Sequence, residues 1–181
     1  FIATSNAVLH NHLKPVFVDV ENDYFSIDPQ KIEEKISKNT RAILPVHLFG
    51  QSADMEPIMQ IANKYKLKVL EDSCETMFVD YNGKPVGSLG DIACFSTYAT
   101  HLITTGVGGL AMTSDADLAI RIKSYCNHGR DNIYLSIDDD DRKKPNELFK
   151  IVDKRFSFIH LGHSFRLTEM EAALGLAQLS N

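Results

Sequence analysis

Lys68–Glu75, with the sequence KVLEDSCE, joins an apolar run of strand length to a cluster of acidic and small polar residues. We read Lys68–Asp72 as a β-strand, because the run is short and ends at the cluster. In open α/β sheets, ligands bind beyond the carboxyl ends of the strands. The cluster Glu71–Glu75 is therefore a candidate site, and the strand before it sets its position.

The chain before this strand alternates between strand and helix patterns. A short apolar run at Ala42–Val46 predicts another strand. Between the two strands, Ala53-Asp54 leads into a predicted helix. Its apolar residues recur at helical spacing: Met55, Ile58, Met59 and Ala62. Strands joined by helices imply an α/β fold with a mostly parallel sheet whose faces are covered.

Further patterns extend this arrangement toward both ends of the chain. Pro15–Val20 is a short β-branched run of strand type, and Asp28-Pro29 predicts the start of a helix toward Ile36. The Asn82-Gly83 pair predicts a hairpin. The remaining predicted elements are strands near Ile92–Thr97 and Gly108–Thr113, and helices at Ala116–Cys126 and Thr168–Leu179. Asp138–Asp141, followed by Arg142–Pro145, reads as an exposed, mobile loop.

Composition excludes several classes of protein. The 181 residues are 44% hydrophobic and carry a formal net charge of -5 with scattered Lys and Arg, so we expect one globular domain that binds no nucleic acid. No apolar run is long enough to span a membrane, and the first residues lack the pattern of a signal peptide. The three cysteines form no C-x-x-C pair, which argues against a disulfide framework or a zinc site. A soluble, cytoplasmic protein is expected.

Three stretches beyond predicted strands carry polar side chains suited to chemistry. They are Glu71–Glu75, Phe95–His101 with the glycine-rich Thr104–Gly109 after it, and Gly162–Arg166. Each also has a structural explanation: Asp72 could cap a helix, Ser96 could be an ordinary strand residue, and the glycines could mark a turn and a bulge. No P-loop, G-x-S-x-G elbow or H-E-x-x-H helix is present. Spacing alone leaves these alternatives open.

Several ordered blocks together resemble a known family. They are PVFVDV (Pro15–Val20), ILPVHLFGQ (Ile43–Gln51), VLED (Val69–Asp72), VGSLGD (Val86–Asp91), CFS (Cys94–Ser96), NHG (Asn127–Gly129) and GHSFR (Gly162–Arg166). In order and spacing they are similar to the sugar aminotransferase family, the DegT/StrS group of fold-type I pyridoxal-phosphate (PLP) enzymes.

The resemblance implies a fold and a domain organisation. The fold is the three-layer α/β/α large domain of the aspartate aminotransferase fold, incomplete at both ends. The chain opens on Phe1 without a methionine and closes directly after a helical pattern, so we expect a fragment. Residues 1–181 would then be the central part of that domain, without the N-terminal segment that holds the phosphate loop and without the small C-terminal domain.

The resemblance also assigns cofactor-binding roles to five residues. Asp72 matches the aspartate that pairs with the pyridine nitrogen of PLP and keeps it protonated, so that the ring can accept electrons. Ser96 matches a serine that hydrogen-bonds the cofactor phosphate, and Phe1 matches an aromatic residue that stacks on the pyridine ring. Glu75 stands where the aminotransferases usually carry Gln or His near the ring hydroxyl. Ser164 replaces an asparagine that reaches the phosphate from the neighbouring subunit.

His101 is the main departure from the family. At this position, five residues after the serine, the aminotransferases carry the lysine that bonds covalently to PLP and moves protons. Imidazole can do only the second of these tasks. The nucleotide-sugar 3-dehydratases, which use pyridoxamine phosphate (PMP), carry the same replacement, so His101 is the candidate catalytic base of a 3-dehydration. Val107 stands where those dehydratases are expected to carry an acid, which leaves the placement within that branch open.

Three functions remain open. The first is a PLP- or PMP-dependent enzyme that removes the 3-hydroxyl of a nucleotide-linked 4-keto sugar, in deoxy- or amino-sugar or polysaccharide biosynthesis. The second is a nucleotide-sugar aminotransferase, and the third is an inactive homologue that acts as a binding partner. For an enzyme, the resemblance implies a nucleotide-activated keto sugar and glutamate as amino donor. It also implies a homodimer with a shared active site, in which Arg166 suits contact with an anion.

Overall fold

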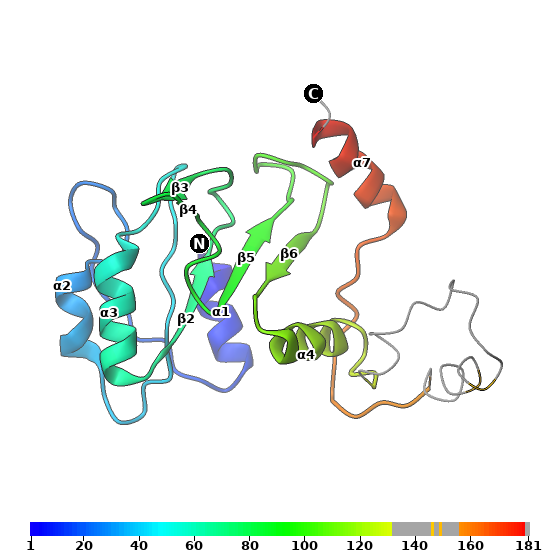
Figure 1. Cartoon of the computed structure of the whole chain (residues 1–181), viewed down its shortest axis with the longest axis horizontal. Helices are drawn as coiled ribbons and strands as arrows, with labels where there is room; N and C mark the ends of the chain where they lie inside the picture. The colour runs from blue at the N-terminus through cyan, green and yellow to red at the C-terminus, as the bar shows by residue number, and fades with distance from the viewer. Residues whose placement is uncertain (132–145, 147–148, 150–155, 180–181) are drawn as a thin grey trace. The chain divides into compact units, whose positions relative to one another are not determined.

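The computed structural model describes residues 1–131, 146, 149 and 156–179, and Figure 1 traces the chain. The chain forms two compact units, Phe1–Met112 and Thr113–Asn181. The loop predicted at 138–145 lies outside the described residues.

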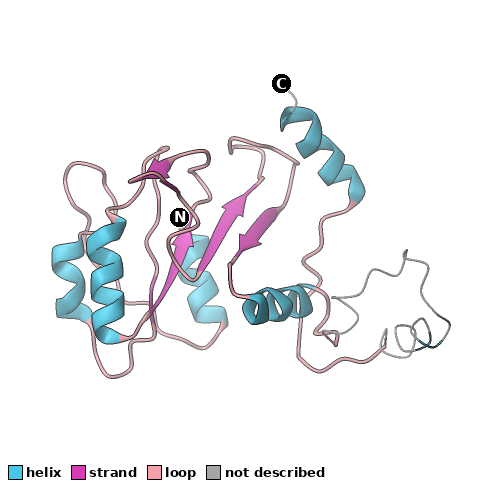
Figure 2. Cartoon of the chain, in the orientation of Figure 1, coloured by secondary structure: helices cyan, strands magenta, loops and turns pink. Residues whose placement is uncertain are grey.

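A four-stranded sheet in the order β1-β2-β5-β6 is the centre of the first unit. Its strands are β1 (Ala42–Ile43), β2 (Lys68–Asp72), β5 (Ile92–Ser96) and β6 (Gly109–Met112). Figure 2 shows its three longer strands, β2, β5 and β6, as magenta arrows. β2 pairs in parallel with β1 and with β5, which confirms the predicted parallel sheet for these three strands. β6 runs antiparallel to β5, because the chain returns through a loop without a crossover helix.

Helices α2 (Pro29–Ile32) and α3 (Met55–Tyr65) form one layer beside the sheet. α2 begins as predicted: the Asp28 side chain accepts a hydrogen bond from the Gln30 backbone N–H, and the short 3-10 helix η1 (Glu33–Lys35) continues it. α3 places its apolar stripe against β1 and β2. The buried core between them contains Ile32, Ile43, Ala53, Met55, Ile58, Ala62 and Val69.

The two faces of β2 have different neighbours. Val69 and Glu71 are buried on the α3 side, while Leu70 and Asp72 alternate with them and are half-buried. On the Asp72 side lies α1 (Ile2–His10), whose Thr4 hydroxyl reaches the Asp72 carboxylate. α1 was not predicted from the sequence. Helices on both faces confirm the covered α/β sheet.

Two further elements test the sequence predictions. The Asn82-Gly83 pair forms the turn of a hairpin between β3 (Asp80–Tyr81) and β4 (Lys84–Pro85), as predicted, and both turn residues have positive φ. Pro15–Val20 is not a strand: its one ladder contact is an isolated bridge from Val20 to Ile27. A β-branched run needs a paired neighbour to form a strand, and in the described part of the chain none runs beside it.

The second unit contains α4 (Ala116–Cys126) and α7 (Glu169–Leu179), both at the predicted positions. Asp115 caps α4 through hydrogen bonds from the backbone N–H groups of residues 117 and 118. After α4, Asn127 and Ser164 form an isolated antiparallel β-bridge. The NHG and GHSFR blocks of the sequence therefore lie side by side. A Cβ on Gly162 would stand 2.1 Å from the Gly129 nitrogen, so this close approach requires glycine.

Candidate cofactor site

Asp72 and Ser96 lie at the carboxyl ends of neighbouring parallel strands. Asp72 is in register with Cys94 of β5, and Ser96 lies two residues further along the same strand. Because side chains alternate between faces along a strand, Ser96 projects on the same face of the sheet as Asp72. The structure therefore brings together these two predicted site residues, which the sequence separates by 24 positions.

The Asp72 carboxylate is held by two hydrogen bonds. Its Oδ2 accepts from the Thr4 hydroxyl at 2.7 Å, and its Oδ1 accepts from the Cys74 backbone N–H at 3.2 Å. The Asp72 backbone is fixed separately, since its N–H donates to Pro45 and its carbonyl accepts from the His47 N–H, each at 2.9 Å. Each carboxylate oxygen keeps room for another donor. Asp72 can therefore accept a hydrogen bond from a protonated nitrogen of a ligand.

The Ser96 hydroxyl accepts a hydrogen bond from the Tyr98 backbone N–H at 3.2 Å. That contact uses a lone pair on Oγ, so within the part of the chain that the structure describes the hydroxyl proton remains free to be donated. A hydroxyl with a free proton at a strand end suits an anion such as a phosphate.

His101 lies in the loop between β5 and β6. Its backbone N–H donates to the Tyr98 carbonyl at 2.9 Å, and its ring meets the Tyr98 ring edge-on with centroids 6.2 Å apart. The Nδ1 atom is buried and has no hydrogen-bond partner among the described residues. A buried imidazole nitrogen without a partner is costly unless a ligand or a proton uses it. That His101 faces the same cavity as Asp72 stays a prediction.

Phe1 and Glu75 belong to the same unit, and both are exposed. The Phe1 side chain is 94% exposed at the N-cap position of α1, three residues before Thr4. It is available for a ring to stack on. The Glu75 side chain is exposed just after Cys74. Neither residue contradicts the role that the sequence assigns to it.

Ser164 lies in the second unit. Its hydroxyl accepts from the Arg166 guanidinium at 3.1 Å, and the same guanidinium nitrogen lies 3.2 Å from Nε2 of His128. All three residues are exposed. This group of a hydroxyl, a guanidinium and an imidazole has the donors to bind an anion. Its relation to Asp72 stays a prediction.

Glu71 precedes Asp72 in the chain, but it is fully buried and its carboxylate is surrounded by hydrogen-bond donors of the protein. Glu71 is 1% exposed, and its carboxylate receives hydrogen bonds from the His47 ring and from three backbone N–H groups, those of Gly87, Leu89 and Gly90. The Ala53 N–H donates to His47 Nδ1, so Nε2 carries the proton that faces Glu71 at 3.0 Å. Burial alone would raise the pKa of Glu71, but these hydrogen bonds outweigh it and lower the pKa.

The structural role of this pair was not predicted from the sequence. Glu71 lies in the acidic cluster that was predicted as a site, and His47 lies in one of the blocks that resemble the family. The strand alternation held a usable signal, because Glu71 shares its face with Val69, a core residue. Nothing in the sequence signalled His47 as its partner or Thr4 as a partner of Asp72.

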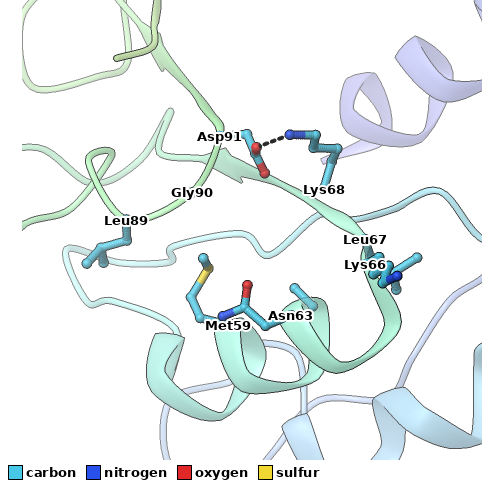
Figure 3. A pocket seen from close by; sticks show the side chains of 9 residues that line it. Met59, Asn63, Lys66, Leu67, Lys68, Leu89, Gly90 and Asp91 are labelled. Atoms are coloured by element: carbon cyan, nitrogen blue, oxygen red, sulfur yellow. Dashed lines mark hydrogen bonds and ion pairs between the residues drawn. The ribbon is translucent and has the colours of Figure 1, made fainter. Parts of the chain in front are cut away.

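Two other features of the first unit do not take part in the site. Burial, followed by interaction with Asp72, raises the pKa of the Cys74 thiol to about 12, so this thiol stays protonated at neutral pH and is a poor nucleophile. The pocket drawn in Figure 3 includes Lys68 and the Asp91 carboxylate with which it pairs at 2.6 Å. This pocket lies at the amino end of β2, at the edge of the sheet opposite Asp72.

The described residues contain no cluster of three or more His, Cys, Asp or Glu side chains able to hold a metal ion. Within the same residues, no helix combines the length and apolar character that crossing a membrane requires. The strand ends therefore offer the Asp72 carboxylate as an acceptor and the Ser96 hydroxyl as a donor. The loop after β5 carries the His101 imidazole, whose Nδ1 has no partner among the described residues.

Comparison with protein families gives one match over the whole chain: the model of the DegT/DnrJ/EryC1/StrS aminotransferase family fits residues 1–181. The chain belongs to this family. The match confirms the resemblance drawn from the ordered blocks, with its fold-type I architecture.

Members of the DegT/DnrJ/EryC1/StrS family include enzymes of different reactions. The chain is 39% identical over 179 residues to GDP-perosamine synthase of Caulobacter vibrioides, a match that covers 99% of this chain and 43% of the relative. The structure superposes with a TM-score of 0.81 on NtdA of Bacillus subtilis with bound cofactor PMP, at 34% identity over 99% of this chain and 36% of that one.

A third member of the family is a dehydratase. The structure matches a mutant of GDP-4-keto-6-deoxymannose-3-dehydratase (ColD) with bound GDP-perosamine, with a TM-score of 0.83 and 26% identity over 99% of this chain and 46% of ColD. The chain thus spans less than half the length of the family members that it matches.

Proposed function

We propose that residues 1–181 form the central part of the cofactor-binding large domain of an enzyme that uses PLP or PMP to remove the 3-hydroxyl of a nucleotide-linked 4-keto sugar. The proposal rests on the identity and surroundings of His101. It stands where the resemblance places a lysine, on the loop that leaves β5 just after Ser96, and its buried Nδ1 has no partner among the described residues. ColD, a family member with this reaction in its name, supports the same assignment.

The side chains at the strand ends fit such a cofactor. When bound, the cofactor supplies an electron-withdrawing pyridinium ring beside its amine-bearing carbon. Asp72 holds the proton on the ring nitrogen, because a carboxylate next to that nitrogen favours its charged form. Ser96 donates its free hydroxyl proton to the phosphate, and Phe1 offers an exposed ring for stacking. His101 takes up and returns a proton at an imidazole nitrogen.

Two further residues complete the proposed site. Glu75 is exposed beside Cys74 and is assigned to the ring hydroxyl of the cofactor. Ser164 and Arg166 are assigned to a phosphate bound by a second copy of the chain, which makes the enzyme a homodimer with shared sites. A guanidinium that already orients a serine hydroxyl is suited to bind a phosphate oxygen.

The overall reaction fixes the co-substrate. Replacement of the 3-hydroxyl by hydrogen, with the hydroxyl oxygen leaving as water, reduces the sugar by two electrons relative to the 4-keto substrate. Glutamate supplies these two electrons: it takes up one water, is oxidised to 2-oxoglutarate and releases its nitrogen as ammonia. The proposal therefore requires glutamate and a nucleotide-activated 4-keto sugar together.

The test uses the full-length protein with PMP, glutamate and a panel of nucleotide-linked 4-keto-6-deoxy sugars. Mass spectrometry of the sugar product distinguishes the candidate reactions. A 3-deoxy-4-keto product supports the proposal. A product that keeps its 3-hydroxyl and carries a new amine would show that the reaction is amino transfer. Turnover of none of the sugars, in protein that binds them, indicates the inactive binding partner.

Amino transfer is the second candidate, and two observations favour it. Val107 stands where the dehydratases are expected to carry an acid, and the chain is 39% identical to a GDP-perosamine synthase. His101→Lys separates the two reactions. Lysine supplies the amine that imidazole lacks, so the variant should trap PLP as a borohydride-stable adduct and shift toward amino transfer. A His101→Lys protein saturated with PLP that gives no such adduct would show that residue 101 is not at the cofactor.

A further inference from the structure

The loop that carries His101 is closed at its base by two buried threonines. Thr97 ends the β5 side and Thr105 begins the return toward β6, and each is 5% exposed. The Thr105 backbone N–H donates to the Thr97 carbonyl at 2.8 Å, and the two hydroxyl oxygens lie 2.7 Å apart. Residues 98–104, with His101 in their middle, lie between these two points.

The direction of the hydroxyl pair follows from its neighbours. The Thr105 hydroxyl lies 2.8 Å from the Val107 carbonyl, which can only accept. The Thr97 carbonyl, at 3.4 Å, is a second and more distant acceptor for the same proton. Thr105 therefore donates to a carbonyl, chiefly that of Val107, and Thr97 donates to Thr105. The result is a short relay from Thr97 through Thr105 to the backbone that leads into β6. Both hydroxyls are satisfied, as buried hydroxyls need to be.

The backbone next to this relay has little stiffness of its own. Gly106 has φ +89 and Gly108 has φ 142, conformations that only glycine adopts readily. Two such glycines give the returning chain many conformations, and backbone contacts already reduce them: the Thr97 N–H donates to the Gly108 carbonyl at 3.1 Å, and Gly106 bridges to Tyr98. The hydroxyl relay restricts the chain further, since it ties the residue between β5 and the loop to a carbonyl between the two glycines.

The imidazole of His101 depends on this restriction. Within the described residues its ring makes no hydrogen bond, and its contact with the Tyr98 ring lies within the same loop. No element outside the loop holds the ring through a polar contact in the part of the chain that the structure describes. The position of the imidazole therefore follows the loop backbone, with no polar contact of the ring to correct it among the described residues.

We propose that the Thr97–Thr105 hydroxyl pair is a positioning device for His101, holding its loop so that the imidazole keeps one orientation. The catalytic meaning of this inference rests on the proposed function of His101, whereas the positioning itself does not. Thr97 and Thr105 are positioning residues: they act through the loop and touch no reacting atom.

The experiment measures the accessibility of His101 in the full-length protein. Diethylpyrocarbonate modifies neutral imidazoles, and peptide mass mapping gives the rate at His101 alone. Thr105→Val removes the hydroxyl at nearly constant shape, and we expect it to raise this rate by about tenfold, as loss of one buried hydrogen bond predicts. Thr105→Ser keeps the hydroxyl and should restore the wild-type rate. Thr97→Val removes the other half of the pair and should match Thr105→Val.

A matched control is available in the same unit. Thr76 is also fully buried, and its hydroxyl donates to the His47 carbonyl at 3.0 Å, away from the loop. Thr76→Val should leave the modification rate of His101 unchanged. The inference is overturned if folded Thr105→Val and Thr97→Val proteins both react like wild type, or if Thr76→Val accelerates the reaction equally.

The kinetic readout separates this inference from the proposed function. A misplaced base lowers kcat more than it raises KM, so Thr105→Val should lose about tenfold in kcat with KM nearly constant. If the sugar assays show no dehydration while the modification rates change as expected, the positioning stands and the proposed reaction fails. If dehydration is found while the rates stay equal, the reaction stands and the positioning fails.

Discussion

Glu71 and Asp72 are consecutive carboxylates on the same strand, and the fold surrounds them in opposite ways. Glu71 is 1% exposed and takes hydrogen bonds from four donors, three of them backbone N–H groups. Asp72 is half-buried and takes two, one of them from the Thr4 side chain. The strand alternation sends one acid into the core and the other to the face that ends at Ser96.

The difference teaches how to separate a structural acid from a binding acid. A carboxylate offers about four acceptor positions. Glu71 has all of them filled by the protein, so it can stabilise only the loops that donate to it. Asp72 has positions left and lies at a strand end, where ligands of such sheets bind. Acceptor capacity, and not acidity or sequence position, distinguishes the two.

The largest effect should come from Glu71→Gln. A glutamine amide brings two N–H donors into a site built from donors, so at least one contact becomes repulsive. We expect the free energy of unfolding to fall by about 3–5 kcal/mol, because buried N–H donors lose their charged acceptor. Urea denaturation of the full-length protein measures it. Glu75→Gln, on the exposed side of the same segment, should change that free energy by less than about 0.5 kcal/mol. Equal losses in both variants would contradict the comparison.

Asp72→Asn should lower turnover strongly and change the free energy of unfolding little, the reverse of Glu71→Gln. Asparagine has nearly the same shape but no charge, so it no longer favours a protonated ring nitrogen. We expect turnover to drop on the order of 10²-fold, as for loss of other preorganised charges at reacting centres. The free energy of unfolding should change by less than about 1 kcal/mol. Folded Glu71→Gln protein, by contrast, should keep most of its turnover. Wild-type turnover in the Asp72→Asn enzyme would show that Asp72 is not part of the cofactor site.

The sequence allowed the prediction of those parts of the fold that local patterns determine. β2 and α4 lie at the predicted residues, Asp28-Pro29 starts α2, and Asn82-Gly83 forms the predicted hairpin. Each of these depends on residues close together in the chain. Pro15–Val20 failed because strand formation depends on a partner that the sequence does not specify.

The site could be predicted only in part, for the same reason. The order of the blocks predicted Asp72 and Ser96, and the sheet register places both on one face. The contacts that distinguish them from other polar residues span long stretches of chain: Thr4 to Asp72 covers 68 positions, and His47 to Glu71 covers 24. Single-sequence periodicity does not report contacts of this length. It also could not separate Glu71 from Asp72 until the buried face of β2 was known.

Thr4→Val should have a smaller effect than Asp72→Asn and of the same kind. The Thr4 hydroxyl donates to Asp72 at 2.7 Å from another element of the fold. Valine has nearly the same shape as threonine, so the substitution removes this donor and leaves α1 in place. Loss of one hydrogen bond to the carboxylate should lower turnover by about tenfold, with a stability loss of about 1 kcal/mol. Ser5→Ala is the matched control, because the Ser5 hydroxyl bonds only the Ile2 carbonyl within α1. Turnover lost equally in Ser5→Ala would assign the effect to the helix.

The smallest effect is the pH dependence that Glu71 contributes. The hydrogen bonds to its carboxylate lower its folded pKa below the ordinary value of 4.5, against the opposing effect of burial. A group with a depressed folded pKa stabilises the protein fully above its unfolded pKa and loses that contribution as pH falls through the folded pKa. Wild type should therefore be more stable than Glu71→Gln by a constant amount above pH 4.5, and the gap should narrow at lower pH. Titrating groups that do not contact Glu71 cancel in this difference, so urea denaturation of both proteins across that range isolates Glu71 together with its partner His47. A gap that stays constant, or widens on acidification, would mean that the Glu71 carboxylate is not charged in the folded protein, and the contrast with Asp72 would then lose its electrostatic basis.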